Sequence, residues 1–499
     1  MQRPQPTIAQ LEQAARGGNE MACIELGNRL IAEHPVGSEQ CERGLELLRG
    51  AADGSQGAAA SWLLGGFFLQ NLALPGGIDE ATRWMQRAAD ARVGPAIDRM
   101  ANLYIRGLGV DFRPERALAL LRQLAEAGFQ RAAWEVGYLL STVDALEDAP
   151  AAATAFARAC ALAFPPAYYS LGLRFATGSG VRPDPAFGRA LLMRADDAGI
   201  PDARAAADEL APVERFGRKV EAWYAKLKAN HAQAGPLLQQ LGGSSMTIAS
   251  ARAPAVDRLE AHFAGLDHPA LAVGGDGRLH VEAGEGPALR ARPADWEWVS
   301  REPRVAISAD FVTREERAQI MSMVRGGLMR PEQYTGGDAH GAAENRFFSG
   351  SGMAFGALTS DAMIRCIERR VAQATGWAPD AIEPSSVIAY RPGQEYRPHV
   401  DFFDERQIRE NRDRIRDYGG QRVVTFLICL RPAERGGETC YPKAGVTVTH
   451  AAGAAMMHYN VLPDGSPDPR SVHHGMPVEA GEKWLLRTTL RARTRYLPE

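Results

Sequence analysis

Residues 386–404 read SVIAYRPGQEYRPHVDFFD, and this stretch combines an apolar run, a Pro-Gly pair and a His-Val-Asp triplet. The apolar run 386–390 predicts a buried strand, and the Pro-Gly pair predicts the turn that follows it. In an extended chain residues two apart point to one face, so His399 and Asp401 can reach a single ion. The pair alone is weak evidence, because roughly half an HxD motif is expected by chance in a chain of this composition.

A third candidate ligand lies 72 residues after Asp401, in the stretch Val472-His-His-Gly-Met-Pro-Val478. Two imidazoles and one carboxylate, with no cysteine at hand, form the facial set that non-haem Fe(II) oxygenases use, and this set leaves three coordination positions open. Zinc prefers a closed tetrahedral set or a different third ligand. His473 and His474 are consecutive and would point to opposite faces of a strand, so only one of them can join His399 and Asp401.

Lys483 is a rare residue type in this chain. Of the 57 basic residues, 52 are arginine and five are lysine, and only two lysines lie in the C-terminal half. A buried ammonium facing the metal would suit the distal carboxylate of a dicarboxylic co-substrate. The alternative is a solvated lysine at the start of a strand.

From residue 303 onward the sequence predicts short strands separated by turns, with two helices. Thr313-Arg-Glu-Glu316 is a capping-box pattern that opens a helix, and residues 360–375 form a second amphipathic pattern. The predicted strands are 305–308, 386–390, 423–430, 447–449, 454–459 and 484–490. This pattern is typical of an antiparallel sandwich or barrel with helices packed outside.

Four motifs in order make residues 303–492 resemble the prolyl 4-hydroxylase branch of the 2-oxoglutarate/Fe(II) dioxygenases. They are SVIAYRPGQEYRPHVDFFD, GGQRVVTFLICL, RGGETCYPKAG and LPDGSPDPRSVHHGMPVEAGEKW. The resemblance implies a double-stranded β-helix, or jelly roll, with helices on one side. It implies Fe(II), 2-oxoglutarate and O2, with ascorbate as reductant, and release of succinate and CO2.

The resemblance also assigns roles to residues. His399, Asp401 and His473 correspond to the iron ligands, and Lys483 to the residue that holds the 2-oxoglutarate C5 carboxylate. The residues that fall at side-chain positions of the co-substrate pocket are Tyr390 and Thr425. His473 rather than His474 occupies the histidine position of the family phrase His-x-Gly-x-Pro-Val. It also lies ten residues before Lys483 and two before Gly475, where the chain can pass close to a metal.

Three stretches depart from the family pattern and leave the substrate open. They are the segment 346–352 (RFFSGSG), the segment after Lys483, and the charged segment 404–417, which we expect to be a loop that is either a solvated face or a lid. The substrate is accordingly a peptidyl proline or another amino acid, free or on a carrier. The competing hypothesis is a repeat-based adaptor whose oxygenase domain senses oxygen and 2-oxoglutarate.

The N-terminal 210 residues repeat with a period near 36. Alanines at equivalent positions are spaced by 38, 36, 36, 35 and 36 residues: Ala22, Ala60, Ala96, Ala132, Ala167 and Ala203. Small residues follow five positions later in most units, which lets two helices approach closely, and this predicts a solenoid of helical hairpins. Residues 8–212 resemble Sel1-like repeats, relatives of the tetratricopeptide repeat, which implies an interaction scaffold that recruits the substrate. The alternative is an Ala-rich bundle with accidental spacing.

The chain is therefore predicted to be multidomain. We expect helical repeats at 1–212, a helical linker with a possible β-hairpin at 213–298, and the dioxygenase domain at 299–499. Residues 213–231 read as a charged helix, and two apolar runs around a Gly-rich turn at 270–281 read as the hairpin.

Composition and charge bear on nucleic-acid binding, membrane insertion and cellular compartment. The net charge of -3 over 499 residues gives no electrostatic argument for nucleic acid or membrane, and no apolar run approaches the roughly 18 residues that a membrane span needs. The first residues contain no apolar signal-peptide core. Six scattered cysteines without a CxxC pair favour a reducing cytoplasm, and the Arg- and Ala-rich composition suggests a GC-rich bacterial genome.

Overall fold

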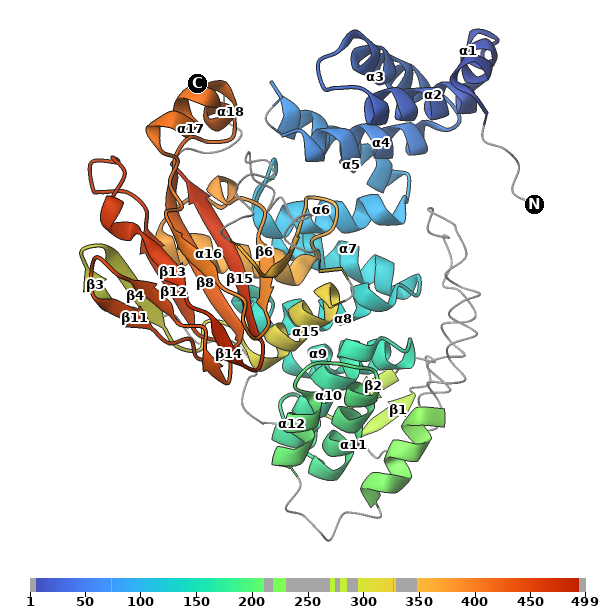
Figure 1. Ribbon diagram of the computed structural model, residues 1–499. Helices are drawn as coiled ribbons and strands as arrows, with labels where there is room; N and C mark the ends of the chain where they lie inside the picture. Colours follow the sequence, from blue (N-terminus) through green and yellow to red (C-terminus); the bar gives the residue numbers. More distant parts are fainter. Residues whose placement is uncertain are drawn as a thin grey trace. The chain divides into compact units, whose positions relative to one another are not determined.

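The computed structural model describes residues 6–72, 74–210, 219–229, 270–273, 279–284, 295–325, 327–328 and 348–492 (Figure 1). The chain divides into two compact units, the first holding the described residues up to Ala127 and the second those from Gly128 onward. This division falls inside the repeats rather than at 212, so the domain boundaries drawn from the sequence stay predictions.

In the described part of the chain, no helix is long and apolar enough to cross a membrane.

The first unit consists of antiparallel helical hairpins. Its helices are α1 (Ile8–Arg16), α2 (Glu20–Glu33), α3 (Glu39–Ala51), α4 (Gly57–Gln70), α5 (Gly77–Asp90), α6 (Gly94–Arg106) and α7 (Pro114–Glu126). Helix α2 packs on α3, α4 on α5 and α6 on α7, so each predicted repeat is one hairpin. The equivalent alanines lie on the first helix of each pair and are buried.

The second unit begins with the same architecture. Its helices continue as α8 (Gln130–Thr142), η1 (Asp144–Leu146), α9 (Ala149–Ala161), α10 (Pro165–Thr177), α11 (Pro185–Asp197) and α12 (Ala203–Glu209). A side chain added at Gly172 would place its Cβ 2.9 Å from Leu192 Cγ and 3.1 Å from the Gly188 carbonyl oxygen. The small residues are therefore the points of closest helix approach, as the sequence predicted.

Two facing antiparallel sheets form the C-terminal part of the second unit. The strands are β3 (Glu297–Arg301), β4 (Arg304–Ser308), β5 (Ser351–Ala354), β6 (Ser386–Tyr390), β7 (Tyr396–His399), β8 (Arg422–Arg431), β9 (Arg435–Gly436), β10 (Thr439–Tyr441), β11 (Val446–Val448), β12 (Ala455–Tyr459), β13 (His473–Gly475), β14 (Val478–Ala480) and β15 (Lys483–Arg491). The larger sheet has the order β3-β4-β12-β8-β15-β6-β5, the smaller has the order β11-β10-β13-β7, and β14 pairs with β9. With the helical repeats, this jelly roll confirms the predicted fold class.

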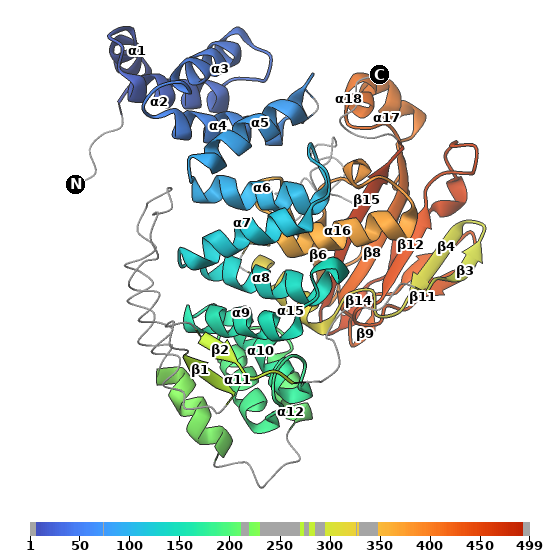
Figure 2. The ribbon, with the colours of Figure 1, turned by 180° about the vertical axis from the view of Figure 1, so that it is seen from behind.

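The core lies between the two sheets. Leu427, Ile388 and Leu485 of the larger sheet cluster with Tyr441 and Val448 of the smaller one. Strand β8 is buried along nearly its whole length because its other face is covered as well. That cover includes α15 (Arg314–Val324) and α16 (Ala362–Thr375), which lie against the larger sheet (Figure 2). A short 3-10 turn, η4 (Pro379–Ala381), follows α16, and η5 (Pro469–Ser471) precedes β13.

Local sequence signals explain where these elements begin. Thr313 accepts a hydrogen bond from the Glu316 backbone while the Glu316 side chain accepts from the Thr313 backbone, so the predicted capping box opens α15. The expected loop 404–417 is wrong, because it forms the short helices α17 (Glu405–Glu410) and α18 (Arg412–Asp417). Asp404 and Gln407 make a second capping box there, which supplies the start signal.

The last repeats contact the oxygenase part directly within the second unit. Tyr138 Oη of α8 donates to Glu316 Oε1 at 2.7 Å, and Arg174 of α10 forms an ion pair with Glu315 at 3.1 Å. All four side chains are buried. Helices α8 and α10 therefore supply part of the surface on which α15 rests.

The region between repeats and sheets is described in part. The predicted hairpin exists, since β1 (Leu271–Val273) pairs antiparallel with β2 (Leu279–Val281), and β2 packs on α9. Residues 219–229 are helical, inside the helix expected at 213–231. The expected linker around 242–245 lies outside the described residues.

Candidate metal centre

Three side chains from separate parts of the jelly roll converge between the sheets. His399 ends β7, Asp401 stands in the bend that follows, and His473 begins β13. Strand β13 pairs antiparallel with β7, with His473 directly opposite His399. The sheet register therefore brings two imidazoles together although they are far apart in the sequence.

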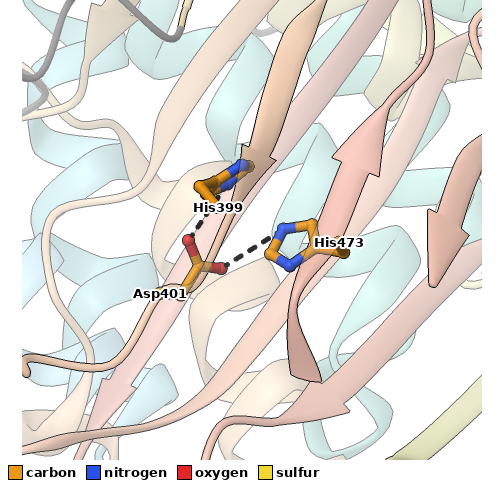
Figure 3. A group of neighbouring side chains, drawn as sticks. All are labelled: His399, Asp401 and His473. Atoms are coloured by element: carbon orange, nitrogen blue, oxygen red, sulfur yellow. Dashed lines mark ion pairs between the residues drawn. The ribbon is translucent and has the colours of Figure 1, made fainter. Parts of the chain in front are cut away.

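The two imidazoles face one carboxylate (Figure 3). His399 Nε2 lies 3.4 Å from Asp401 Oδ1, and His473 Nε2 lies 3.8 Å from Asp401 Oδ2. One donor atom from each of the three residues lies within 4.8 Å of the other two. Among the described residues, this is the one group of three or more His, Cys, Asp or Glu side chains that is arranged to hold a metal ion.

Backbone carbonyls orient both imidazoles. His399 Nδ1 lies 2.8 Å from the Arg397 carbonyl oxygen, and His473 Nδ1 lies 3.1 Å from that of Ser471. Each Nδ1–H donates to its carbonyl, so Nε2 is the nitrogen available to bind a metal. Tyr396 stacks on His399 with ring centroids 3.6 Å apart, which restricts rotation of that ring.

Electrostatics keep Asp401 ionised. Burial by itself raises the pKa of Asp401, but the imidazoles of His473, His399 and His458, whose Nε2 atoms approach its oxygens, hold that pKa well below its usual range. Burial, together with the neighbouring His399, keeps the pKa of His473 well below its usual range. The cluster therefore offers two imidazole nitrogens and one anionic oxygen, which is the donor chemistry of a non-haem Fe(II) site.

A cavity beside the cluster contains the other three predicted site residues. Its lining includes Tyr390, Thr425 and Lys483 as well as His399. Tyr390 and Lys483 stand opposite each other in the pairing of β6 with β15, and the Lys483 Nζ lies 5.6 Å from the Tyr390 ring centre. Thr425 Oγ1 donates to Asp401 Oδ2 at 2.7 Å, so this hydroxyl holds the carboxylate as well as lining the cavity.

Lys483 is a buried cation without a counter-ion. Its side chain is 3% exposed, and it forms no hydrogen bond or ion pair with any described residue. Burial lowers its pKa to about 8, against an ordinary value of 10.5. An ammonium held this way in a cavity fits an incoming carboxylate, which would supply the missing negative charge.

The structure separates the two adjacent histidines. His474 lies outside the cluster and its Nε2 is 2.9 Å from Glu395 Oε2. His473 is inside the cluster and buried. The arrangement is the one expected from strand alternation, and the assignment of His473 as the metal ligand stays a prediction.

Sequence reasoning missed a further set of side chains around Asp401. His458 is fully buried, with its Nε2 3.4 Å from Asp401 Oδ2, and Asn460 Nδ2 donates to Thr425 Oγ1 at 3.1 Å. The signal was present in the strand pattern, because residues 456 and 458 share one face of a strand. Without the register that places His458 opposite Thr425, however, nothing linked it to the ligands.

Comparison with known proteins places this site in a class. The family model of the 2OG-Fe(II) oxygenase superfamily matches residues 385–490, which include the cluster and Lys483. Probable prolyl 4-hydroxylase 3 of Arabidopsis thaliana is 30% identical over 227 residues, covering 42% of this chain and 75% of the relative. Probable prolyl 4-hydroxylase 8 of the same plant is 31% identical over 208 residues, covering 38% and 68%.

Two solved structures are similar to this chain at low sequence identity. A viral collagen prolyl hydroxylase from Paramecium bursaria Chlorella virus-1 is 20% identical, covers 38% of this chain and 96% of that one, and has a TM-score of 0.30. A Sel1 repeat protein from Oxalobacter formigenes is 20% identical, covers 54% and 84%, and has a TM-score of 0.37.

The chain belongs to the prolyl 4-hydroxylase family of 2OG-Fe(II) oxygenases. It is therefore a dioxygenase of the hydroxylase type, and its family uses Fe(II), 2-oxoglutarate and O2. The donor set of His399, Asp401 and His473 fits Fe(II), and the uncompensated Lys483 fits the co-substrate.

Proposed function

We propose that this protein hydroxylates an unactivated C–H bond of a peptidyl or free amino acid. The overall reaction converts substrate, 2-oxoglutarate and O2 to hydroxylated substrate, succinate and CO2. The observation that supports it most is one cavity that contains both the histidine–carboxylate cluster and the unpaired Lys483. We propose ascorbate as the reductant and the cytoplasm as the compartment.

Different residues would bind the metal and the co-substrate. His399, Asp401 and His473 would hold the iron, which with 2-oxoglutarate supplies the activation of O2 when bound. Lys483 would hold the C5 carboxylate, with the Tyr390 ring beside its ammonium. Asp401, His473 and Lys483 are buried, so these interactions act in a medium of lower dielectric constant than water.

The helical repeats would recruit the target. Hairpin solenoids expose an extended surface made of equivalent positions, which suits a peptide or protein ligand. Proline is the substrate class of the relatives named above. The segment 346–352, which departs from the family pattern, leaves other amino acids open, and its first two residues lie outside the described part of the chain.

The test is formation of succinate from 2-oxoglutarate with Fe(II) and ascorbate, with and without proline-containing peptides. We expect slow uncoupled turnover alone and faster turnover with a substrate, together with a mass increase of about 16 on the product, one oxygen atom. Asp401→Ala is the control and should abolish both. Metal-dependent binding of 2-oxoglutarate without any succinate would contradict hydroxylation and support the adaptor alternative.

A further inference from the structure

A second layer of side chains holds one oxygen of Asp401. We propose that His458, oriented by Tyr441, is a positioning residue that fixes the Asp401 carboxylate through Oδ2 and leaves Oδ1 for the metal. This inference rests on the proposed function, because it concerns how the site presents itself to iron. The ligand role of the three residues in the cluster does not by itself require any residue at position 458.

His458 has one polar neighbour on each side of its ring. It lies on β12, is 0% exposed, and stands opposite Thr425 in the pairing with β8. Its Nδ1 is 2.7 Å from Tyr441 Oη, and its Nε2 is 3.4 Å from Asp401 Oδ2. Within the described part of the chain, Nε2 has no other polar group in reach.

The hydrogen bond with Tyr441 selects the tautomer of His458. The Tyr441 hydroxyl has a strong acceptor in Nδ1 and otherwise only the weakly accepting Met456 Sδ at 3.8 Å. If Tyr441 donates to Nδ1, the ring N–H is on Nε2 and points at the carboxylate. The other tautomer would place a lone pair against an anionic oxygen in a buried site, which is unfavourable.

The two oxygens of Asp401 are therefore in different surroundings. Oδ2 accepts from Thr425 Oγ1 at 2.7 Å and faces the Nε2–H of His458, while His473 is more distant at 3.8 Å. Oδ1 faces His399 Nε2 at 3.4 Å. A shift of a few tenths of an ångström would bring the His458 contact into the usual range of an N–H···O bond. With Oδ2 occupied by two donors, Oδ1 is the oxygen free to bind.

The consequence concerns the number of open metal positions. A carboxylate that binds through one oxygen leaves three positions on a six-coordinate ion, whereas one that binds through both leaves two. A facial site needs all three for a bidentate co-substrate and O2. His458 would thus protect the open face by preventing the carboxylate from turning both oxygens toward the metal.

The experiment compares His458→Phe, which removes the donor, with His458→Gln, whose amide can donate from about the same place. Anaerobic titration of the full chain with Co(II) gives affinity, and the visible spectrum of the Co(II) form reports coordination number. We expect His458→Phe to bind about 10–100-fold more weakly, with a changed spectrum. His458→Gln should restore both to near the wild-type values.

Controls separate positioning from a general loss of packing. Met457→Leu changes the neighbouring buried residue of β12, whose side chain is on the opposite face, and should leave affinity and spectrum unchanged. Tyr441→Phe should weaken Co(II) binding in the wild type but have little effect in His458→Gln, because the amide needs no tautomer selection. This pair keeps the test decisive if His458→Phe does not fold.

Each outcome bears on a different claim. A wild-type protein that binds no Co(II) would overturn the proposed function and this inference together. Wild-type binding with unaltered affinity and spectrum in His458→Phe would overturn the inference alone. Equal losses in the Gln and Phe variants would also overturn it, because they would show that only the shape of the side chain matters.

Discussion

Replacing Lys483 by methionine should stabilise the metal-free protein while weakening co-substrate binding. Methionine keeps most of the length of the side chain but removes the buried charge. The fall of the Lys483 pKa from 10.5 to about 8 corresponds to a cost of about 3 kcal/mol for keeping this ammonium in the folded protein at pH 7. Because burial outweighs the attraction of Glu438 and no described residue forms an ion pair with this ammonium, removing the charge should raise the melting temperature by several degrees.

The sign of the pH dependence follows from the depressed pKa. Below pH 8 the lysine is charged in both states, so the full cost is present. Between pH 8 and 10.5 the unfolded chain binds the proton and the folded one does not, so wild-type stability rises with pH. The advantage of Lys483→Met should therefore shrink to less than half between pH 7 and pH 9.5.

Co-substrate binding should change in the opposite direction. Removing one partner of a buried charge pair costs about 2–5 kcal/mol, so the Kd for 2-oxoglutarate should rise at least about 30-fold. Anaerobic titration of the metal-loaded protein measures it, and metal affinity should be retained. Lys443→Met is the matched control, since Lys443 is exposed and, among the described residues, donates only to the Pro469 carbonyl oxygen.

Two results would refute this reasoning. An unchanged Kd would show that another cation holds the carboxylate, and Arg487, which lines the same cavity, is then the one to replace. Arg491 is a poorer candidate, because it forms an ion pair with Glu383 and donates to the Gly420 carbonyl oxygen. A lower melting temperature at pH 7 would show that the ammonium stabilises the fold rather than straining it.

Three further predictions concern the metal ligands, the domain cut and the repeats. His473→Ala should abolish Fe(II)-dependent turnover, whereas His474→Ala should change metal affinity by at most about 10–100-fold. Metal titration of both variants tests this. If His474→Ala loses the metal and His473→Ala keeps it, the ligand is His474 instead. A protein comprising residues 128–499 should fold and bind Fe(II), whereas a protein comprising residues 250–499 should expose the buried face of α15 and aggregate. Size-exclusion chromatography and metal binding measure both outcomes. If the 250–499 protein is monomeric and binds metal, the result would support the domain boundary predicted from the sequence. Gly172→Ala should destabilise the second unit by about 1–3 kcal/mol, because the new Cβ would meet a neighbouring backbone, and a urea midpoint equal to that of the wild type would contradict it.

Local patterns predicted most of the fold. The strand expected at 386–390 is β6 with the same bounds, and the capping box at Thr313 begins α15. The 36-residue period predicted the hairpins because each repeat contacts mainly its neighbours, so the information is local. The helices at 405–417 were missed although Asp404 and Gln407 form the same start signal, because the density of charge there suggested a solvated loop.

The candidate site was predicted as a set of residues but not as an arrangement. His399, Asp401 and His473 do converge, and Tyr390, Thr425 and Lys483 do share their cavity. The contact of Thr425 with Asp401 joins residues 24 positions apart, and the approach of His458 depends on the pairing of β8 with β12, which places His458 opposite Thr425. Sequence spacing carries no direct information about such pairing.

The junction between the repeats and α15 has a consequence for the order of events during synthesis. Tyr138 leaves the ribosome 178 residues before its partner Glu316, an interval on the order of ten seconds or more at cellular translation rates. Helical hairpins fold in a small fraction of that time, since their contacts are local. Helices α8 and α10 are therefore folded before the slower, non-local sheets begin to form. They offer α15 of the nascent jelly roll a preformed surface to pack against within the same chain.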